Sequence, residues 1–390
     1  MRPEVELLLY CANTSIDTAR TEKVRGLLRT DLDWAYILQT AGRHGVTPLL
    51  SRSLQTISPN DVPQAILEQL QHHSRANAAH NLFLTNELLK ILKLLEAHVI
   101  PALPYKGPLL TASIYGNLAL RDFADLDILV HEQNYQQAQR LLSTHGYQPL
   151  NAFEQESTFL DGSGRVTVDL HKRMTSREFP SPLQFEQIWK RRQQTTILST
   201  KVPTLSPEDT LLMLAIQMTK DAGTPYLQLA RICDIAQLLR TYPDLDLIRI
   251  LRQSKELGGE RMVLFSLCLA NHLLDTPLLQ EVSDKVRAQP TIDQLAELTC
   301  QQLFDDRAPS ATDRRSIDHF RWLVRERLRD KLYPYYLRYV LATFVPCTLD
   351  RQLLPLPQRL AFLYYGIRPI RLLYKYGSLF FARHLGRAVR

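Results

Sequence analysis

The most constraining feature of this sequence is the run Asp-Leu-Asp-Ile-Leu-Val at residues 125–130. Side chains alternate between the two faces of a β-strand, so a strand here places Asp125 and Asp127 on one face and Leu126 and Ile128 on the other. Side chains two residues apart are rooted roughly 6 to 7 Å from each other, which lets their carboxylates converge on hard cations such as Mg²⁺. The plain alternative is an edge strand whose two acids are solvated and bind nothing.

A Lys-Gly pair, an arginine and an Asp-His pair accompany this run. They are Lys106 and Gly107, which precede an expected helix; Arg121, four residues before the first acid; and Asp169 with His171, about forty residues later. The Asp-His pair ends a strand-like stretch with alternating Val and Leu residues, so its two polar side chains share a face. If that face also carries the first two acids, three carboxylates meet.

This pattern resembles a bacterial nucleotidyltransferase family of the DNA polymerase β-like superfamily, in which Lys-Gly precedes a helix and Arg-x-x-x-Asp-x-Asp-x-Leu-Val follows it. The matching residues are Lys106, Gly107, Tyr115, Arg121, Asp125, Asp127, Leu129 and Val130, followed by Val168-Asp169-Leu170-His171. The wider superfamily has Gly-Gly or Gly-Ser in place of the Lys-Gly pair. The segment 33–50 and the run 231–236 also resemble the helical regions that flank the core in this family.

The resemblance implies an α+β fold with a polymerase β-like nucleotidyltransferase core, a small mixed sheet with helices, flanked by N- and C-terminal helical domains. It also implies an enzyme that uses Mg²⁺ or Mn²⁺ to move a nucleoside monophosphate from an NTP, such as ATP, onto a hydroxyl group. The expected catalytic and metal-binding residues are Asp125, Asp127 and Asp169. The expected nucleotide-binding residues are Lys106, Gly107, Arg121 and His171.

Several of these residues also have a plainer interpretation. Arg121 pairs with Asp122 or Asp125, and Lys106 extends to solvent at the end of a strand. His171 hydrogen-bonds a neighbouring acid without touching a nucleotide. The alternative function is a catalytically silent nucleotide-binding or interaction module that keeps the fold. Three intact acids favour the enzyme, because clustered carboxylates without a metal repel one another.

The chain of 390 residues is long enough for two or three domains. Apolar residues at helical spacing predict an N-terminal helical region over residues 1–80. Residues 81–200 contain the motif and are predicted to form the nucleotidyltransferase core. Residues 201–390 are predicted to form a C-terminal helical domain with a basic aromatic tail.

Local signals predict where several elements begin and end. Asp33 is predicted to cap the start of a helix, and His44 is interpreted as a residue at the end of that helix rather than as a catalytic base. The turn residues Asp-Gly-Ser-Gly at 161–164 predict a hairpin that leads into the strand ending at His171. The segment 179–203 contains prolines and a basic run, so it is predicted to connect domains.

The composition narrows the possible compartments and partners. A formal net charge of +7 and a pI near 9.1 agree with an anionic partner such as a nucleotide. The five cysteines are scattered without metal-binding spacing and are expected to be reduced thiols. No run of eighteen apolar residues offers a transmembrane segment, and no signal sequence is recognisable, so a cytoplasmic protein is expected.

The expected partners are the NTP and an acceptor that the sequence leaves open: a small molecule, an RNA end or a protein. Specificity in such a fold lies in the flanking helical regions, whose composition is ordinary. Residues 359–390 include basic residues and no acids. This tail is expected either to pack its apolar side chains on the helical domain or to make a weak contact with an anionic surface.

Overall fold

The computed structural model describes residues 1–153, 155–175, 183–305, 314–336, 342–346, 350–351 and 354–385. The chain divides into two compact units, Met1–Glu326 and Arg327–Arg390. The first unit combines a small mixed sheet with many helices, which is the α+β fold expected from the sequence. The three-part division with boundaries near residues 80 and 200 stays a prediction.

A five-stranded sheet carries the acidic motif. Its strands are β1 (Ala102–Pro104), β2 (Asp125–Val130), β3 (Tyr147–Ala152), β4 (Glu156–Asp161) and β5 (Thr167–His171). Their order is β1-β2-β5-β4-β3, with β2 and β5 parallel and the other neighbours antiparallel. The proline-containing β1 lies at an edge, as expected, because proline has no backbone N–H to donate to a neighbouring strand. The strand β2 has the bounds that the alternation predicts.

The two faces of this sheet pack against different layers. Leu126 and Ile128 of β2 are buried among apolar residues of α5 (Gln64–Ala97) and α7 (Tyr135–Thr144). Leu129 belongs to the opposite face and joins a second core, which the helices on that side provide. Because side chains alternate along β2, Asp125 and Asp127 share the face of Leu129. The acidic motif therefore lies on the face of the sheet that packs against this second core.

The part of the chain before the sheet is helical, as expected. Its helices are α1 (Pro3–Cys11), α2 (Thr18–Leu28), α3 (Trp34–Arg43), α4 (Thr47–Ile57) and the 34-residue α5. The Asp33 carboxylate accepts the N–H of Tyr36 at the start of α3, and His44 is the C-cap residue of that helix. Both predictions are confirmed.

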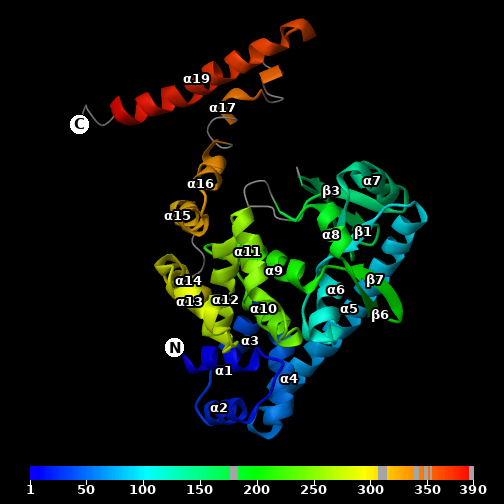
Figure 1. The fold of residues 1–390 in the computed structure, drawn as a ribbon, viewed down its shortest axis with the longest axis vertical. Helices are drawn as coiled ribbons and strands as arrows, with labels where there is room; N and C mark the ends of the chain where they lie inside the picture. Colours follow the sequence, from blue (N-terminus) through cyan, green and yellow to red (C-terminus); the bar gives the residue numbers. More distant parts are fainter. Residues whose placement is uncertain are drawn as a thin grey trace. The chain divides into compact units, whose positions relative to one another are not determined.

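The helices after the sheet are α9 (Pro207–Asp221), α10 (Leu229–Thr241), α11 (Leu247–Leu257), α12 (Glu260–Leu274), α13 (Gln280–Arg287), α14 (Pro290–Leu303) and α15 (Arg314–Val324). They share one continuous apolar core with α1 to α4. In Figure 1 the blue N-terminal helix α1 lies beside α12. Segments more than 150 residues apart in the sequence thus build one helical layer.

The segment 179–203, which was predicted to connect domains, contains regular secondary structure in its described part. Its described part contains α8 (Phe185–Arg191) and a hairpin of β6 (Gln193–Ile197) and β7 (Thr200–Thr204), whereas residues 176–182 lie outside the described residues. The hairpin turn uses positive φ angles at Leu198 and Ser199, and the flanking strands are rich in Thr. The sequence analysis did not predict this helix and hairpin, because the prolines and the basic run obscure the β-branched pattern, and the connecting role of the segment stays a prediction.

The second unit contains α16 (Leu328–Tyr335), α17 (Ala342–Phe344) and α19 (Tyr364–Leu385). Two arginines of α19, Arg368 and Arg371, form ion pairs of 2.9 and 2.7 Å with the buried carboxylate of Asp350. These two cations therefore have an internal partner. The side chains of Lys375 and Arg383 lie outside the described residues, so contact of the tail with an anionic surface stays a prediction.

Cys11, Cys233, Cys268 and Cys300 carry free thiols, as expected, and Cys347 lies outside the described residues. Across the described part of the chain, no helix is both long and apolar enough to cross a membrane. The cytoplasmic location stays a prediction.

Candidate active site

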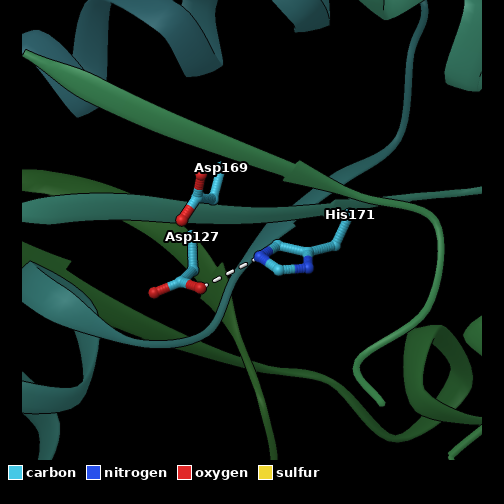
Figure 2. A group of neighbouring side chains, drawn as sticks. All are labelled: Asp127, Asp169 and His171. Carbon is cyan, nitrogen blue, oxygen red and sulfur yellow. Dashed lines mark hydrogen bonds and ion pairs between the residues drawn. The ribbon is translucent and has the colours of Figure 1, made fainter. Parts of the chain in front are cut away.

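Asp127 and Asp169 lie directly opposite each other on the parallel strands β2 and β5. Residues paired in register point to the same face of a sheet, so the two carboxylates lie side by side. His171 follows on the same face, and Figure 2 shows its ring directed at Asp127. One ligand atom from each of the three residues lies within 4.8 Å of the others. The pairing of β2 with β5, which the sequence does not specify, thus assembles this cluster.

The Asp127 carboxylate is buried and makes two polar contacts. Its Oδ1 accepts a hydrogen bond from Lys106 Nζ at 2.7 Å and lies 3.0 Å from His171 Nε2. Burial alone raises the pKa of Asp127, but Lys106 and His171 outweigh it and hold that pKa well below its usual value. Asp127 is therefore ionised in the folded protein.

The other two acids of the motif have the opposite shift. Burial raises the pKa of Asp125, and the charge of Asp127 raises it further. Burial and the neighbouring Asp127 likewise raise the pKa of Asp169. Three carboxylates near one point repel one another, and the shifts record this repulsion. A bound cation relieves such repulsion.

Two oxygen atoms of this cluster fit a divalent cation. Asp127 Oδ2 and Asp169 Oδ1 are buried and have no hydrogen-bond partner among the described residues. A buried carboxylate oxygen without a donor is costly, and hard cations prefer carboxylate oxygen ligands. Asp127 and Asp169 would hold the ion, whereas Asp125, two residues earlier on the same face, is not part of the close group formed by Asp127, Asp169 and His171 in the described structure.

His171 connects the acids to a residue that the sequence analysis missed. Its Nδ1 lies 3.2 Å from the carboxylate of Glu156 on β4. Burial lowers the pKa of His171, but the contacts with Asp127 and Glu156 outweigh it and raise that pKa above its usual value. Glu156 is paired with His171 in the antiparallel register of β4 and β5, and no sequence signal specifies this register.

Gly107 is required by the close packing of the chain beside the motif. Its φ of +50° lies in the left-handed region, and a Cβ atom there would lie 3.1 Å from the backbone oxygen of Asp125. The glycine thus lets the start of α6 (Gly107–Leu110) approach β2 closely. This close approach holds Lys106 next to Asp127.

Arg121 has a different environment from the one expected. Its guanidinium is buried and binds both carboxylate oxygens of Asp234 on α10, at 3.0 to 3.1 Å. Tyr115 donates a further hydrogen bond to the same carboxylate at 3.0 Å. The expected partners Asp122 and Asp125 are not its hydrogen-bond partners in the described structure, and Asp122 instead lies 3.6 Å from His73. The motif arginine therefore joins the core to the helical layer.

A cavity of about 570 Å³ opens beside the acids. One wall carries Lys106, Asp125 and Asp127. Other lining residues include His73 of α5 and Arg231 of α10. Arg121 also reaches the lining, although its charge is paired with Asp234. The cavity is thus acidic at the sheet and has cationic residues around it, which suits a phosphate compound bound with a metal ion.

The chain matches a known protein family over more than half of its length. A family model described as "Uncharacterised nucleotidyltransferase" matches residues 30–275. One similar solved structure is the lincosamide antibiotic adenylyltransferase LnuA with bound lincomycin, at 21% identity, a TM-score of 0.30, and coverage of 39% of this chain and 94% of that chain. Another is an antigenic nucleotidyltransferase-like protein from Paracoccidioides brasiliensis, at 13% identity, a TM-score of 0.32, and coverage of 58% and 96%. The search of curated proteins gave no match.

Proposed function

The chain belongs to the uncharacterised nucleotidyltransferase family, and from that premise we propose that it transfers a nucleoside monophosphate from an NTP to a hydroxyl group in an Mg²⁺-dependent reaction. The observation that carries the proposal is the opposed pair Asp127 and Asp169, with one buried oxygen on each that has no hydrogen-bond donor in the described structure. The family match covers these strands, so the cluster lies inside the matched region.

In this proposal Asp125, Asp127 and Asp169 hold the metal. A divalent cation bound there supplies positive charge to the α-phosphate and to the leaving pyrophosphate. Lys106 adds a second positive charge beside the same acids, since its ammonium lies 2.7 Å from Asp127. These charges stabilise the negative charge that grows on the pyrophosphate oxygens as the reaction proceeds.

The chemical step exchanges one bond at phosphorus for another. The acceptor oxygen bonds to the α-phosphorus, and the bond from that phosphorus to the oxygen bridging to the β-phosphorus breaks, releasing pyrophosphate. Asp169 accepts the hydroxyl proton as the general base, since it lies opposite Asp127 at the point where the acceptor would approach. His171 orients Asp127 through the 3.0 Å contact of its Nε2.

The acceptor is a small molecule, an RNA end or a protein, and the three remain alternatives. A catalytically silent nucleotide-binding module with the same fold is the second candidate function. The unpartnered acidic oxygens favour the enzyme, because a module without a metal would keep their cost without using them. The two functions differ in whether NTP binding leads to a labelled product.

The test is incubation of the purified protein with cell extract, Mg²⁺ and each α-labelled NTP in turn. The proposal expects label to appear in one extract fraction, and to disappear with EDTA, with Asp127→Asn and with Asp169→Asn. Asp31→Asn is the matched control, because Asp31 is an exposed residue between α2 and α3. NTP binding without any labelled product would support the silent module instead.

A further inference from the structure

The charge of Arg121 is compensated by Asp234, although Arg121 reaches the lining of the cavity. Both charged groups are buried, and the guanidinium edge that carries Nε and Nη2 faces the carboxylate. An arginine held in such a pair has little attraction left for a phosphate, because its charge is already compensated. A triphosphate in the cavity carries about four negative charges and needs cations besides Lys106 and the metal.

Arg231 is placed to provide that charge. It lies on α10 one turn before Asp234 and lines the same cavity as Lys106, Asp125 and Asp127. Its Nε is 3.7 Å from Asp221 Oδ2, which is longer than a hydrogen bond, and its side chain is 27% exposed. The guanidinium is therefore at the cavity wall and loosely held.

The charge of Arg231 reaches the acidic face. It lowers the pKa of Asp125, partly offsetting the increase from burial and from Asp127. It also acts on Asp221, the other acid near it. These effects agree with the lining of the cavity in placing the guanidinium between α10 and the motif.

The backbone of α10 is not available for the same purpose. The N–H groups of Leu229 and Ala230 at its start point to His44, one to the ring Nδ1 and one to the backbone oxygen. The Arg231 N–H is bonded to the Gln228 oxygen. The first amides of this helix are thus already used, so the anion-binding group that α10 presents to the cavity is the Arg231 side chain.

We propose that Arg231 binds the β- and γ-phosphates of the NTP, while Arg121 and Asp234 hold α10 in place. The proposal rests on the nucleotidyltransferase function proposed above and assigns a phosphate ligand outside the Lys-Gly and acidic motifs. A planar guanidinium forms two parallel hydrogen bonds with phosphate oxygens, which suits the distal phosphates. The helical layer thereby takes part in nucleotide binding.

Calorimetric binding of ATP, GTP, CTP and UTP in Mg²⁺ to the wild-type protein identifies the nucleotide, and its monophosphate is then measured beside it. Arg231→Ala is expected to weaken triphosphate binding roughly ten- to a hundredfold, the loss for a charge-assisted hydrogen bond, and to change monophosphate binding less than about threefold. The triphosphate affinity of Arg231→Lys is expected to lie between that of the wild type and that of Arg231→Ala. Arg252→Ala is the matched control, because Arg252 is an exposed arginine of α11 outside the cavity.

The outcomes separate the two proposals. If the wild-type protein binds none of the four triphosphates, the proposed function fails. If it binds one, and Arg231→Ala keeps the wild-type affinity or loses triphosphate and monophosphate equally, the inference about Arg231 is overturned while the proposed function stands. Thermal unfolding of each variant with a single transition near that of the wild type shows that the comparison concerns folded protein.

Discussion

Lys106 Nζ and Asp127 Oδ1 are 2.7 Å apart, so a residue expected to bind phosphate is bonded to a residue expected to bind metal. The two come from opposite ends of the motif, and the close approach of Gly107 to β2 brings them together. In the absence of a cation the ammonium supplies the positive charge that Asp127 needs. This relationship makes Lys106 a sensitive point for testing the site.

Lys106→Ala is expected to weaken triphosphate binding more than monophosphate binding, by roughly 1 to 3 kcal/mol, because a charge-assisted contact to the distal phosphates is lost. Lys106→Arg is expected to restore part of the loss, since a planar fork does not replace a compact ammonium. Calorimetry with both ligands measures the difference. Lys93→Ala on the exposed side of α5 is the control. Equal losses for both ligands would remove Lys106 from the phosphate site.

Asp127→Asn and Asp169→Asn are expected to abolish Mg²⁺-dependent turnover alike but to change stability in opposite directions. The folded protein stabilises the charge of Asp127 and destabilises that of Asp169, as the opposite pKa shifts show. Asp127→Asn should therefore lower the unfolding free energy by roughly 2 to 4 kcal/mol. Asp169→Asn should be neutral or stabilising.

Urea unfolding in EDTA measures both variants without any metal contribution. A large loss of stability in Asp169→Asn, similar to that in Asp127→Asn, would contradict the opposite electrostatic environments of the two acids. Retained turnover in either variant would contradict its place in the metal site.

Asp234→Ala is expected to destabilise the protein by about 3 to 5 kcal/mol, because it leaves the buried guanidinium of Arg121 without a counter-charge. The combined change Arg121→Met and Asp234→Leu removes both charges and should recover much of this loss. Chemical unfolding of Arg121→Met, of Asp234→Leu and of the double variant gives the coupling free energy. If the two changes are simply additive, the ion pair does not link the core to α10.

His44 predicts a dependence of stability on pH. Burial and the nearby Arg43 lower its pKa to about 4. The ring Nδ1 accepts the Leu229 N–H, and the ring packs against Phe304. An unfolded histidine has a pKa near 6.5. The unfolded state therefore binds the proton more tightly, and the contribution of His44 is complete above pH 6.5 and is lost as the pH falls toward 4.

The loss attributable to His44 is at most about 3 kcal/mol between pH 7 and pH 4. Urea unfolding of wild-type protein and His44→Gln across this range checks it, since the variant should show a shallower decline. His98→Gln is the matched control, because His98 is the exposed C-cap residue of α5. The same decline in His44→Gln and wild type would show that His44 is not the titrating group.

The local structure of this protein is readable in its sequence because it depends on neighbours along the chain. The alternation at 125–130 specifies β2 and the face of its two acids, and Asp33 and Ser206 cap the helices that follow them. The Lys-Gly pair and the spaced acids also carry the resemblance to the family that the match to residues 30–275 confirms. Strand β3 escaped the sequence analysis, since five of its six residues are exposed and no apolar alternation marks them.

Tertiary structure determines which of these strands and helices contact one another. The sequence offers Asp169 as a third acid, but only the parallel register of β2 and β5 places it opposite Asp127. Glu156 and Asp234 reach His171 and Arg121 through strand register and helix packing, and neither contact has a local signal. Contacts between distant residues depend on how whole elements pack, and that packing follows from the burial of both apolar cores together rather than from any short run of residues.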